Sequence, residues 1–288
     1  MSNATGEQLA RVNGVELCWQ AFGDPADPPL VLLHGASDSM LAWREGFCDL
    51  LADGGRYVVR YDSRDAGRST TYEPGAPQYA EGDLIADAAA LIDALGLGRV
   101  HFAGLSGGGA TAQVLAIEHP EKLASLVLLS TTPGEPGRDT ADLPGMDPRL
   151  ESVFSDEGPE PDWADREAVV DYLVEAERPF AGSGGFDAEA QREYAERVFT
   201  RTASLAAQTT NPFLVESEPW RERLGEIAAP TLVIHGSDDP LFPLPHGEAL
   251  AREIPSAELL VLEGVGHEYP PPRTWDTVAA AILRHTAP

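Results

Sequence analysis

The sequence predicts an α/β protein with a mostly parallel central sheet of about eight strands, helices on both faces and a helical insertion. Three observations support this prediction. Strand-like and helix-like segments alternate up to residue 129, an apolar run leads into a Gly-x-Ser-x-Gly pentapeptide followed by a helix, and the alternation resumes at residue 230. Such alternation builds parallel strands, because each crossover helix returns the chain to start the next strand in the same direction.

Short apolar runs predict the strands. The segment Glu7 to Phe22 alternates loosely and contains Asn13-Gly14, a strong hairpin pattern, so we expect two antiparallel strands at a sheet edge. The six later runs are short and mainly apolar, which is typical of strands that are covered on both faces. They are Leu30–Leu33, Tyr57–Tyr61, Val100–Ala103, Leu123–Leu129, Pro230–His235 and Glu258–Leu262.

Helical periodicity places a helix after most of these strands. Gly54-Gly55 and Gly96 end the first two helices, as glycine commonly does. The predicted helices of the α/β part are Met40–Asp53, Tyr79–Leu95, Ala110–Glu118, His246–Ile254 and Trp275–His285.

Residues 133–219 interrupt the alternation and predict a helical cap over the sheet, which leaves residues 1–132 and 220–288 as the core domain. The first part of the cap is crowded with Gly, Pro and Asp, whereas Arg166–Glu177 and Ala188–Gln208 have helical periodicity. We expect the aromatic residues of the cap to form mostly its own core, with some facing the site below. They are Phe154, Trp163, Tyr172, Phe180, Phe186, Tyr194, Phe199 and Phe213.

The acidic composition excludes two classes of partner. The 288 residues include 47 acidic and 20 basic side chains, which gives a formal net charge of −27. Such a surface repels nucleic acid and anionic membranes, so we expect neither as a partner. No apolar stretch approaches the roughly 18 residues that a membrane span requires. The first 14 residues lack the basic and apolar regions of a signal peptide, so we expect a cytoplasmic protein.

Cysteine and histidine usage indicates no disulfide framework and no metal. Cys18 and Cys48 lie on a predicted strand and a predicted helix, and we interpret both as small buried residues in a reducing compartment. The seven histidines include no pair at metal-ligand spacing. We therefore expect neither a metal site nor a cofactor.

The pentapeptide Gly104-Leu105-Ser106-Gly107-Gly108 lies between a predicted strand and a predicted helix. A strand that turns sharply into a helix with a serine at the bend is a nucleophile elbow. Neighbouring strands and the helix press close to such a bend, so Gly104 and Gly108 must lack side chains. This setting favours a catalytic role for Ser106 over a flexible glycine-rich loop.

A serine hydroxyl is a poor nucleophile near neutral pH, so Ser106 requires a base, and the base requires an acid that fixes its tautomer. Asp239 and His267 each follow a predicted strand directly, and in a parallel sheet such loops meet at the carboxyl edge. His267 ends a Gly-x-Gly-His loop that presents one side chain. We predict a catalytic triad of Ser106, Asp239 and His267.

The acid loop leaves alternatives open. Asp239 completes a Gly-x-x-Asp pattern that starts at Gly236 and is followed by Pro240, which makes Asp238 the solvated neighbour. A purely structural turn is also compatible with this loop, because Asp is favoured in turns. His246 begins a predicted helix near the loop and is a candidate for lining the pocket.

Backbone amides are candidates for stabilising the oxyanion of an acyl-transfer reaction, where each donor typically contributes about 2.7–4 kcal/mol. We assign them to Gly107, which follows the nucleophile, and to Ala36, in the loop after an earlier strand. We interpret His34 as the residue that holds this loop through hydrogen bonds. We interpret residues 62–67 as a structural turn whose charges bond backbone groups beneath the site.

Together these residues resemble the α/β-hydrolase superfamily, and the resemblance covers nearly the whole chain. Four stretches, residues 21–35, 51–71, 230–251 and 254–270, are similar to the aclacinomycin methylesterase group of bacterial aromatic-polyketide tailoring enzymes and to the actinobacterial hydrolases beside it. The resemblance implies an enzyme that removes a methyl ester from a bulky polycyclic substrate under a helical cap.

The same resemblance implies a nucleophile at Ser106, an acid at Asp239, a base at His267 and oxyanion amides at Ala36 and Gly107. Three features depart from the family pattern. Gly107 stands where members often have Met, the oxyanion loop reads His-Gly-Ala instead of a run of glycines, and the cap matches least. The reaction type therefore carries over better than the substrate.

We predict a serine hydrolase that cleaves the carboxylic ester of a small molecule through an acyl-enzyme, as a monomer or homodimer. The same triad is compatible with C–C, lactone or amide hydrolysis. A non-enzymatic ligand receptor on the same scaffold is the alternative from a different class. Epoxide hydrolases and haloalkane dehalogenases are disfavoured, because they need an aspartate where this chain has Ser106.

Overall fold

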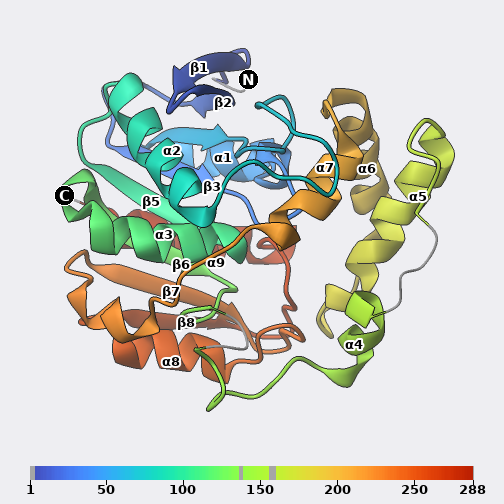
Figure 1. Ribbon diagram of the computed structural model, residues 1–288. Helices are drawn as coiled ribbons and strands as arrows, with labels where there is room; N and C mark the ends of the chain where they lie inside the picture. The colour runs from blue at the N-terminus through green and yellow to red at the C-terminus, as the bar shows by residue number, and fades with distance from the viewer. Residues whose placement is uncertain (1–3, 136–138, 156–159, 288) are drawn as a thin grey trace.

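A single sheet forms the centre of the protein (Figure 1). The computed structural model describes residues 4–135, 139–155 and 160–287. Within these residues the strands are β1 Gln8–Val12, β2 Val15–Phe22, β3 Pro29–Leu33, β4 Tyr57–Tyr61, β5 Val100–Leu105, β6 Leu123–Leu129, β7 Thr231–Gly236 and β8 Glu258–Leu262. Their order across the sheet is β1-β2-β4-β3-β5-β6-β7-β8. The pairs β1–β2 and β2–β4 are antiparallel and all other pairs are parallel, so the predicted sheet is confirmed.

Local sequence explains the pairing of these strands. The hairpin between β1 and β2 turns at Asn13 and Gly14, whose φ angles are 44° and 81°, as a two-residue hairpin with the right twist requires. Every residue of β7 is buried, and only the first residue of β3 is not. Burial on both faces accounts for the continuous apolar sequence of these strands.

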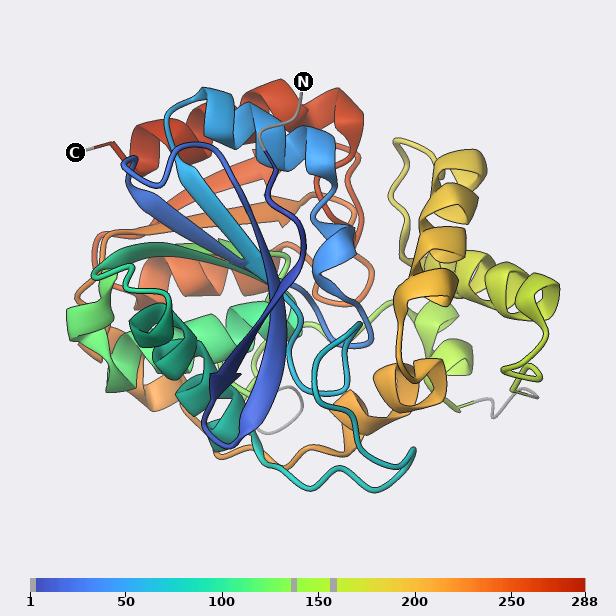
Figure 2. The ribbon, with the colours of Figure 1, turned by 90° about the horizontal axis from the view of Figure 1, so that it is seen from above.

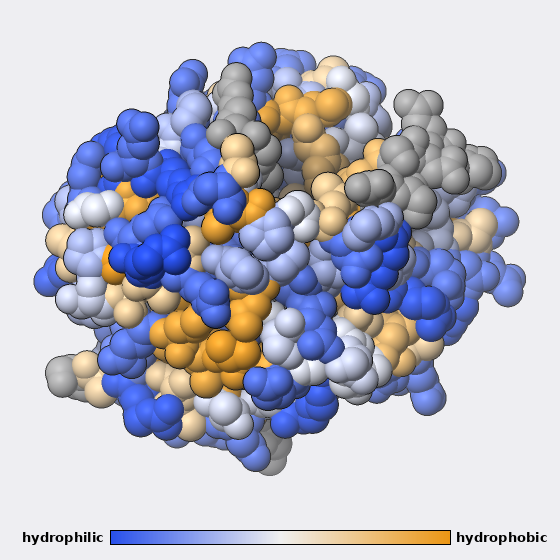
Figure 3. All heavy atoms as spheres, turned by 90° about the horizontal axis from the view of Figure 1, so that it is seen from below, coloured by the Kyte–Doolittle hydropathy of each residue, from blue (hydrophilic) through white to orange (hydrophobic). Residues whose placement is uncertain are grey.

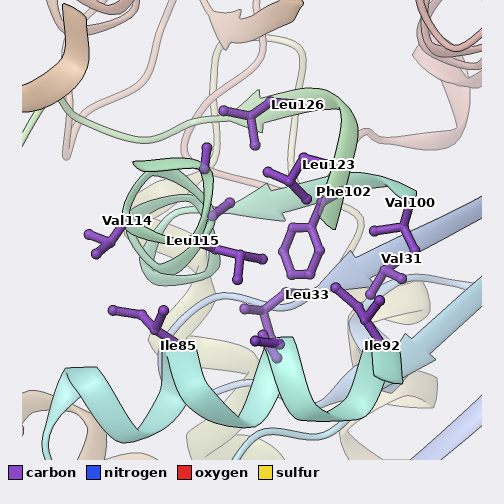
Figure 4. Close-up of a cluster of buried hydrophobic side chains, with 14 of the residues drawn as sticks. Val31, Leu33, Ile85, Ile92, Val100, Phe102, Val114, Leu115, Leu123 and Leu126 are labelled. Carbon is purple, nitrogen blue, oxygen red and sulfur yellow. The ribbon is translucent and has the colours of Figure 1, made fainter. Parts of the chain in front are cut away.

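Helices cover both faces of the sheet (Figure 2). The helices α1 Glu45–Asp53 and α9 Trp275–His285 lie together on one face, and α2 Glu81–Ala94, α3 Gly107–Glu118 and α8 Pro245–Glu253 lie on the other. Each face has its own apolar core. Figure 4 shows the core under α2 and α3, where Phe102 and Leu33 of the sheet pack against Ile92 and Leu115 of the helices. The layered α/β architecture is therefore confirmed.

The predicted insertion is helical and lies beside the sheet (Figure 2). Its helices are α4 Pro148–Ser155, α5 Arg166–Glu177, α6 Ala188–Arg201 and α7 Leu205–Thr210, with 3-10 turns at Arg178–Phe180 and Asn211–Leu214. Val170 and Val174 of α5 pack on Ala195 of α6, so the insertion has an apolar cluster of its own. Residues 136–138 and 156–159 of the insertion lie outside the described residues, and its boundaries at 132/133 and 219/220 stay a prediction.

Two helix predictions in the insertion need correction. The single helix expected over residues 188–208 is two helices, because the chain is extended at Thr202 and Ser204 then caps α7. The Ser204 hydroxyl accepts a hydrogen bond from the amide of Ala207 at 3.2 Å, and such a cap competes with continuation of the preceding helix. We did not predict α4, since its sequence lies in the stretch crowded with Gly, Pro and Asp.

An arginine anchors the insertion to the core. Arg201, at the end of α6, places its guanidinium 2.6 Å from Asp62 and 2.8 Å from Glu7, and its side chain is 6% exposed. Asp62 is buried and also accepts hydrogen bonds from two backbone amides, at 2.8 and 3.0 Å. The turn at residues 62–67 therefore bonds backbone groups as expected, and it also binds a helix of the insertion.

The interior contains both cysteines, and the face of the surface drawn in Figure 3 is mostly hydrophilic. Cys18 and Cys48 are both buried and free, as their sequence setting predicts. None of the helices in the described ranges has the length and apolar character needed to span a membrane. On the face shown in Figure 3, hydrophilic side chains surround separate apolar patches.

Candidate active site

The turn between β5 and α3 is a strained strand-to-helix bend. Ser106 at its tip has φ 52° and ψ −118°, a conformation that residues with a β-carbon rarely adopt. A β-carbon added to Gly104 would overlap the carbonyl oxygen of Gly108, and one added to Gly108 would overlap the carbonyl oxygen of His34. Both glycines therefore have the steric role that the sequence predicts, and they allow Ser106 to stand at the end of the sheet.

Substitution of Gly108 with alanine is expected to destabilise the protein by about 3 kcal/mol, because the added methyl group meets backbone atoms that cannot move aside. Gly82→Ala is a matched control, since Gly82 lies exposed in α2 and a β-carbon there has nothing within 4 Å. Alanine at residue 82 should stabilise the helix by about 0.5–1 kcal/mol. Urea unfolding compares the two variants, and a Gly108→Ala protein as stable as wild type would contradict the steric account.

The structure brings the three predicted triad residues into one hydrogen-bonded row. Oγ of Ser106 lies 3.0 Å from Nε2 of His267, and Nδ1 of His267 lies 2.9 Å from Oδ2 of Asp239. Oδ1 of Asp239 accepts hydrogen bonds from the amides of Leu241 at 2.9 Å and Phe242 at 2.8 Å. Hydrogen bonds therefore hold both carboxylate oxygens of Asp239. Because Oδ2 accepts from Nδ1, the neutral imidazole carries its proton on Nδ1. Nε2 is then free to accept the Ser106 proton.

The surroundings of Asp239 keep it ionised although its side chain is fully buried. Burial alone would raise its pKa. The charge and hydrogen bond of His267, with smaller effects from His235 and the Phe242 amide, outweigh burial and hold the pKa of Asp239 below its ordinary value. A carboxylate that is charged at neutral pH can stabilise an imidazolium beside it.

His235 is hydrogen-bonded to the loop that carries Asp239, and the sequence analysis did not predict this contact. Its Nε2 donates a hydrogen bond to the carbonyl oxygen of Phe242 at 2.7 Å and lies 3.6 Å from Oδ2 of Asp239. Burial lowers the pKa of His235, which favours the neutral ring. The available signal was a histidine inside the apolar run of β7, where a buried polar side chain needs a partner.

Asp238 is a partly exposed neighbour, as the sequence suggests, and it also binds the insertion. It is partly buried, its Oδ2 accepts a hydrogen bond from the amide of Ser183 at 2.9 Å, and its Oδ1 accepts one from the Ser237 hydroxyl at 2.8 Å. The hydrogen bonds from Ser183, followed by that from Ser237, hold the pKa of Asp238 below its ordinary value. Asp238 thus attaches the insertion to the acid loop, while Asp239 makes the hydrogen bond to His267.

The insertion also contacts His267 directly. The amide of His267 donates a hydrogen bond to the carbonyl oxygen of Phe180 at 2.8 Å. The rings of Phe180 and Phe242 lie with their centroids 6.0 and 5.4 Å from that of His267. A β-carbon on Gly266 would overlap the Phe180 carbonyl oxygen, so the glycine before the base is required for this approach. Sequence reasoning grouped Phe180 with the aromatic residues of the cap and did not place it at the base.

The residues that carry the two predicted oxyanion amides, Ala36 and Gly107, lie against each other next to Ser106. The backbone nitrogen of Ala36 lies 3.3 Å from the position that a β-carbon on Gly107 would occupy, and both residues are exposed. Among the described residues, neither amide donates a hydrogen bond. Two unpaired amides beside a nucleophile can bind an oxyanion that forms there.

His34 holds the oxyanion loop as expected. Its Nδ1 donates a hydrogen bond to the carbonyl oxygen of Gly35 at 2.7 Å, and its Nε2 accepts one from the amide of Ser63 at 3.1 Å. Burial lowers the pKa of His34, which favours the neutral ring that this pattern requires. The role is structural, because both ring nitrogens are engaged with backbone groups.

His246, the candidate for lining the pocket, is engaged in structural contacts. It is buried, and its ring nitrogens lie 2.7 Å from the Thr132 hydroxyl and 2.8 Å from the carbonyl oxygen of Pro144. Among the described residues, no group of three or more His, Cys, Asp or Glu side chains is arranged to hold a metal ion.

Comparison with known proteins identifies the family. A family model described as alpha/beta hydrolase fold matches residues 28–269. The chain belongs to the α/β-hydrolase family. Rhodomycin D methylesterases from Streptomyces sp. (strain C5) and Streptomyces peucetius are 32% and 30% identical to it, each over 94% of this chain and 95% of their own length. A 2-hydroxy-6-oxononadienedioate/2-hydroxy-6-oxononatrienedioate hydrolase from Burkholderia vietnamiensis is 28% identical over 83% of this chain and 80% of its own.

Two solved structures share the fold of this hydrolase. The 2-hydroxy-6-oxo-6-phenylhexa-2,4-dienoate hydrolase from Rhodococcus sp. strain RHA1 aligns over 99% of both chains with a TM-score of 0.75 and 21% identity. The esterase RhEst1 from Rhodococcus sp. ECU1013 aligns over 97% of this chain and 99% of its own, with a TM-score of 0.75 and 22% identity. These matches show the α/β-hydrolase fold. The resemblance of the sequence to actinobacterial methylesterases is confirmed by the Streptomyces relatives.

Proposed function

We propose that this hydrolase cleaves carboxylic esters through an acyl-enzyme formed on Ser106. The observation that carries the proposal is the hydrogen-bonded row of Ser106, His267 and Asp239 beside the unpaired amides of Ala36 and Gly107. These groups are the nucleophile, the general base, the acid that orients it and the donors for an oxyanion. The methylesterase names of two relatives favour an ester over other acyl compounds.

The geometry supports a two-step reaction. Oγ of Ser106 attacks the ester carbonyl carbon while Nε2 of His267 takes the hydroxyl proton, and the carbonyl electrons move to the oxygen held by the Ala36 and Gly107 amides. His267 then gives the proton to the departing alcohol as the C–O bond breaks, which leaves the acyl group on Ser106. Water attacks this ester with the same base, and the released acid restores Ser106.

Asp239 stabilises the imidazolium that forms in both steps. Because the pKa of Asp239 lies below its ordinary value, the carboxylate is charged whenever His267 takes a proton. The pair is buried on the Asp239 side, where a charge interaction is stronger than in water. The same hydrogen bond keeps the imidazole from turning away from Ser106.

A row of phenylalanine rings leads from the base to the surface and favours a bulky aromatic substrate. The ring of Phe180 lies 6.2 Å from that of Phe154, which lies 6.4 Å from that of Phe213, and both contacts are edge-on. Phe154 and Phe213 are 49% and 61% exposed. Phe180 beside His267 and the two exposed rings beyond it offer apolar surface to a planar ring system. We propose the methyl ester of a polycyclic aromatic acid as the substrate class.

C–C bond hydrolysis is the second candidate, and one observation favours it. The Burkholderia relative is named as a hydrolase of a 2-hydroxy-6-oxo dienedioate, and it is nearly as similar in identity as the methylesterases. A C–C hydrolase of this family uses the same kind of site, so the positions of Ser106, His267 and Asp239 do not separate the two reactions.

A substrate panel tests the proposal. The values of kcat/KM are compared for methyl esters of polycyclic aromatic acids, short p-nitrophenyl esters and 2-hydroxy-6-oxo dienoates, with Ser106→Ala as the background. The polycyclic methyl ester should exceed the short ester by about tenfold or more, because apolar contacts with the rings add binding energy in the transition state. Preferred turnover of the dienoate would replace the ester proposal with C–C hydrolysis. Ester turnover that does not exceed the Ser106→Ala background would contradict the proposal.

A further inference from the structure

The loop that carries the Ala36 amide is bound by side chains from two distant segments. The amide of Gly35 donates a hydrogen bond to the hydroxyl of Tyr269 at 2.8 Å. Asp38, in the same loop as Ala36, lies beside the Tyr269 hydroxyl, and after burial its charge is the main cause of the raised pKa of Tyr269. Asp38 in turn accepts a hydrogen bond from the hydroxyl of Tyr194 at 2.8 Å. Tyr269 follows the base His267 by two residues, and Tyr194 lies in α6 of the insertion.

A phenol has one hydrogen to donate and lone pairs to accept, so Tyr269 accepts from Gly35 and has its one hydrogen available for the neighbouring Asp38. Tyr194 donates its hydrogen to Oδ1 of Asp38. Asp38 therefore accepts a hydrogen bond from Tyr194 and lies beside the hydroxyl of Tyr269. The chain runs from the insertion, through Asp38 and Tyr269, to the amide of Gly35.

These contacts fix the peptide groups on both sides of Gly35. The N–H of the peptide group before it is bound by Tyr269. The carbonyl oxygen of the peptide group after it is bound by Nδ1 of His34 at 2.7 Å. Because a trans peptide is planar, holding this oxygen on one side directs the N–H of Ala36 to the opposite side. The direction of the Ala36 N–H thus depends directly on His34, and on Tyr269 through the backbone of Gly35 that joins the two peptide groups.

We infer that Tyr269 is a positioning residue that aligns the Ala36 amide with the oxyanion, and that Asp38 and Tyr194 make this alignment depend on the docked insertion. The inference rests on the proposed function, because it gives Tyr269 a task at the oxyanion site of an acyl transfer. The insertion holds the base loop in a similar way, through the Phe180 carbonyl oxygen and the His267 amide. The insertion therefore contributes to the alignment of the catalytic groups.

Tyr269→Phe tests the inference with a small change. The variant removes the hydroxyl and keeps the ring, which packs edge-on against Trp43 with centroids 5.2 Å apart. We expect kcat for the ester to fall about 10- to 100-fold, less than the 10²- to 10³-fold loss of a whole oxyanion donor, with KM within about twofold of wild type. Tyr194→Phe, one step further along the chain, should lower kcat about 3- to 10-fold. Tyr172→Phe is the matched control, because this exposed tyrosine of α5 packs on Trp163, and its kcat should be unchanged.

A tetrahedral analogue separates alignment from general loosening. A trifluoromethyl ketone adds to Oγ of Ser106, its carbonyl electrons become an oxyanion at the two amides, and His267 takes the serine proton. Its inhibition constant in Tyr269→Phe should rise by the same factor by which kcat/KM falls. An unchanged kcat, or a loss confined to KM with an unchanged inhibition constant, would overturn the inference. The thermal midpoint shows whether Tyr269→Phe folds. If it does not, kcat/KM and the inhibition constant are compared in the same way for Tyr194→Phe and Asp38→Asn.

The two levels of the account fail differently. If wild-type protein does not hydrolyse esters above the Ser106→Ala background, the proposed function fails and the inference about Tyr269 fails with it. If wild type hydrolyses esters and Tyr269→Phe retains its full kcat, the proposed function stands and only the positioning role is lost.

Discussion

Replacing Ser106 with alanine is expected to lower kcat for ester hydrolysis by about 10⁶-fold with little change in KM. Oγ of Ser106, 3.0 Å from Nε2 of His267, is the atom that attacks the carbonyl in this account. Without it, only the Ala36 and Gly107 amides and substrate binding act on the ester, and these sustain roughly 10³- to 10⁴-fold acceleration over water. The variant should fold normally, since a methyl group fits wherever the hydroxymethyl group does. Product release at saturating substrate and a thermal midpoint measure the two effects.

A double variant extends this test, because residues that act as one unit are not additive. Adding Asp239→Asn to Ser106→Ala should lower kcat no further, since an acid that orients the base has no task when the nucleophile is missing. A Ser106→Ala protein that keeps more than about 1% of wild-type kcat would show that the reaction does not pass through this serine.

Asp239→Asn is expected to lower kcat by about 10⁴-fold. The asparagine amide would present a donor to Nδ1 of His267, so the ring would carry its proton on Nε2 and could not accept one from Ser106. Asp238→Asn is the matched control one residue away, with the same change in charge and shape. Its kcat should stay within about threefold of wild type, because Asp238 contacts Ser183 of the insertion and an asparagine oxygen can accept that hydrogen bond.

Steady-state kinetics of the two variants at constant pH decide between the two aspartates. A large loss in Asp238→Asn with a small loss in Asp239→Asn would move the acid by one residue. Equal and small losses of kcat in both variants would show that neither aspartate acts in catalysis. The loop at residues 236–240 would then be only a structural turn, which its composition also allows.

Local sequence was sufficient for the sheet and for the hydrogen-bonded row of Ser106, His267 and Asp239. Buried strands must be apolar along their whole length, which made β3 and β7 visible as short apolar runs. The bend at Ser106 needs glycine at residues 104 and 108, because backbone atoms lie close to both positions. The Gly-x-Ser-x-Gly pattern shows this requirement directly. Asp239 and His267 could be placed because loops that follow parallel strands meet at one sheet edge.

Contacts between distant segments could not be predicted in the same way. Tyr269 and Gly35 are 234 residues apart in the sequence, and no periodicity in either segment indicates that they meet. The helix break at Thr202 and Ser204 depends on a capping hydrogen bond that competes with a continuous helical pattern. The fold of the insertion and its attachment to the base therefore became visible only in three dimensions.

The central claim is that Ser106 is the nucleophile, and covalent labelling tests it most directly. The protein is incubated with a fluorophosphonate, and its intact mass and peptide map are then measured. In the expected reaction, Oγ of Ser106 displaces fluoride and forms one phosphonate ester per chain, with His267 taking the proton. We expect stoichiometric label on Ser106, slow labelling of Asp239→Asn and none of Ser106→Ala. A wild-type protein that stays unlabelled, or that carries the label on another residue, would contradict it.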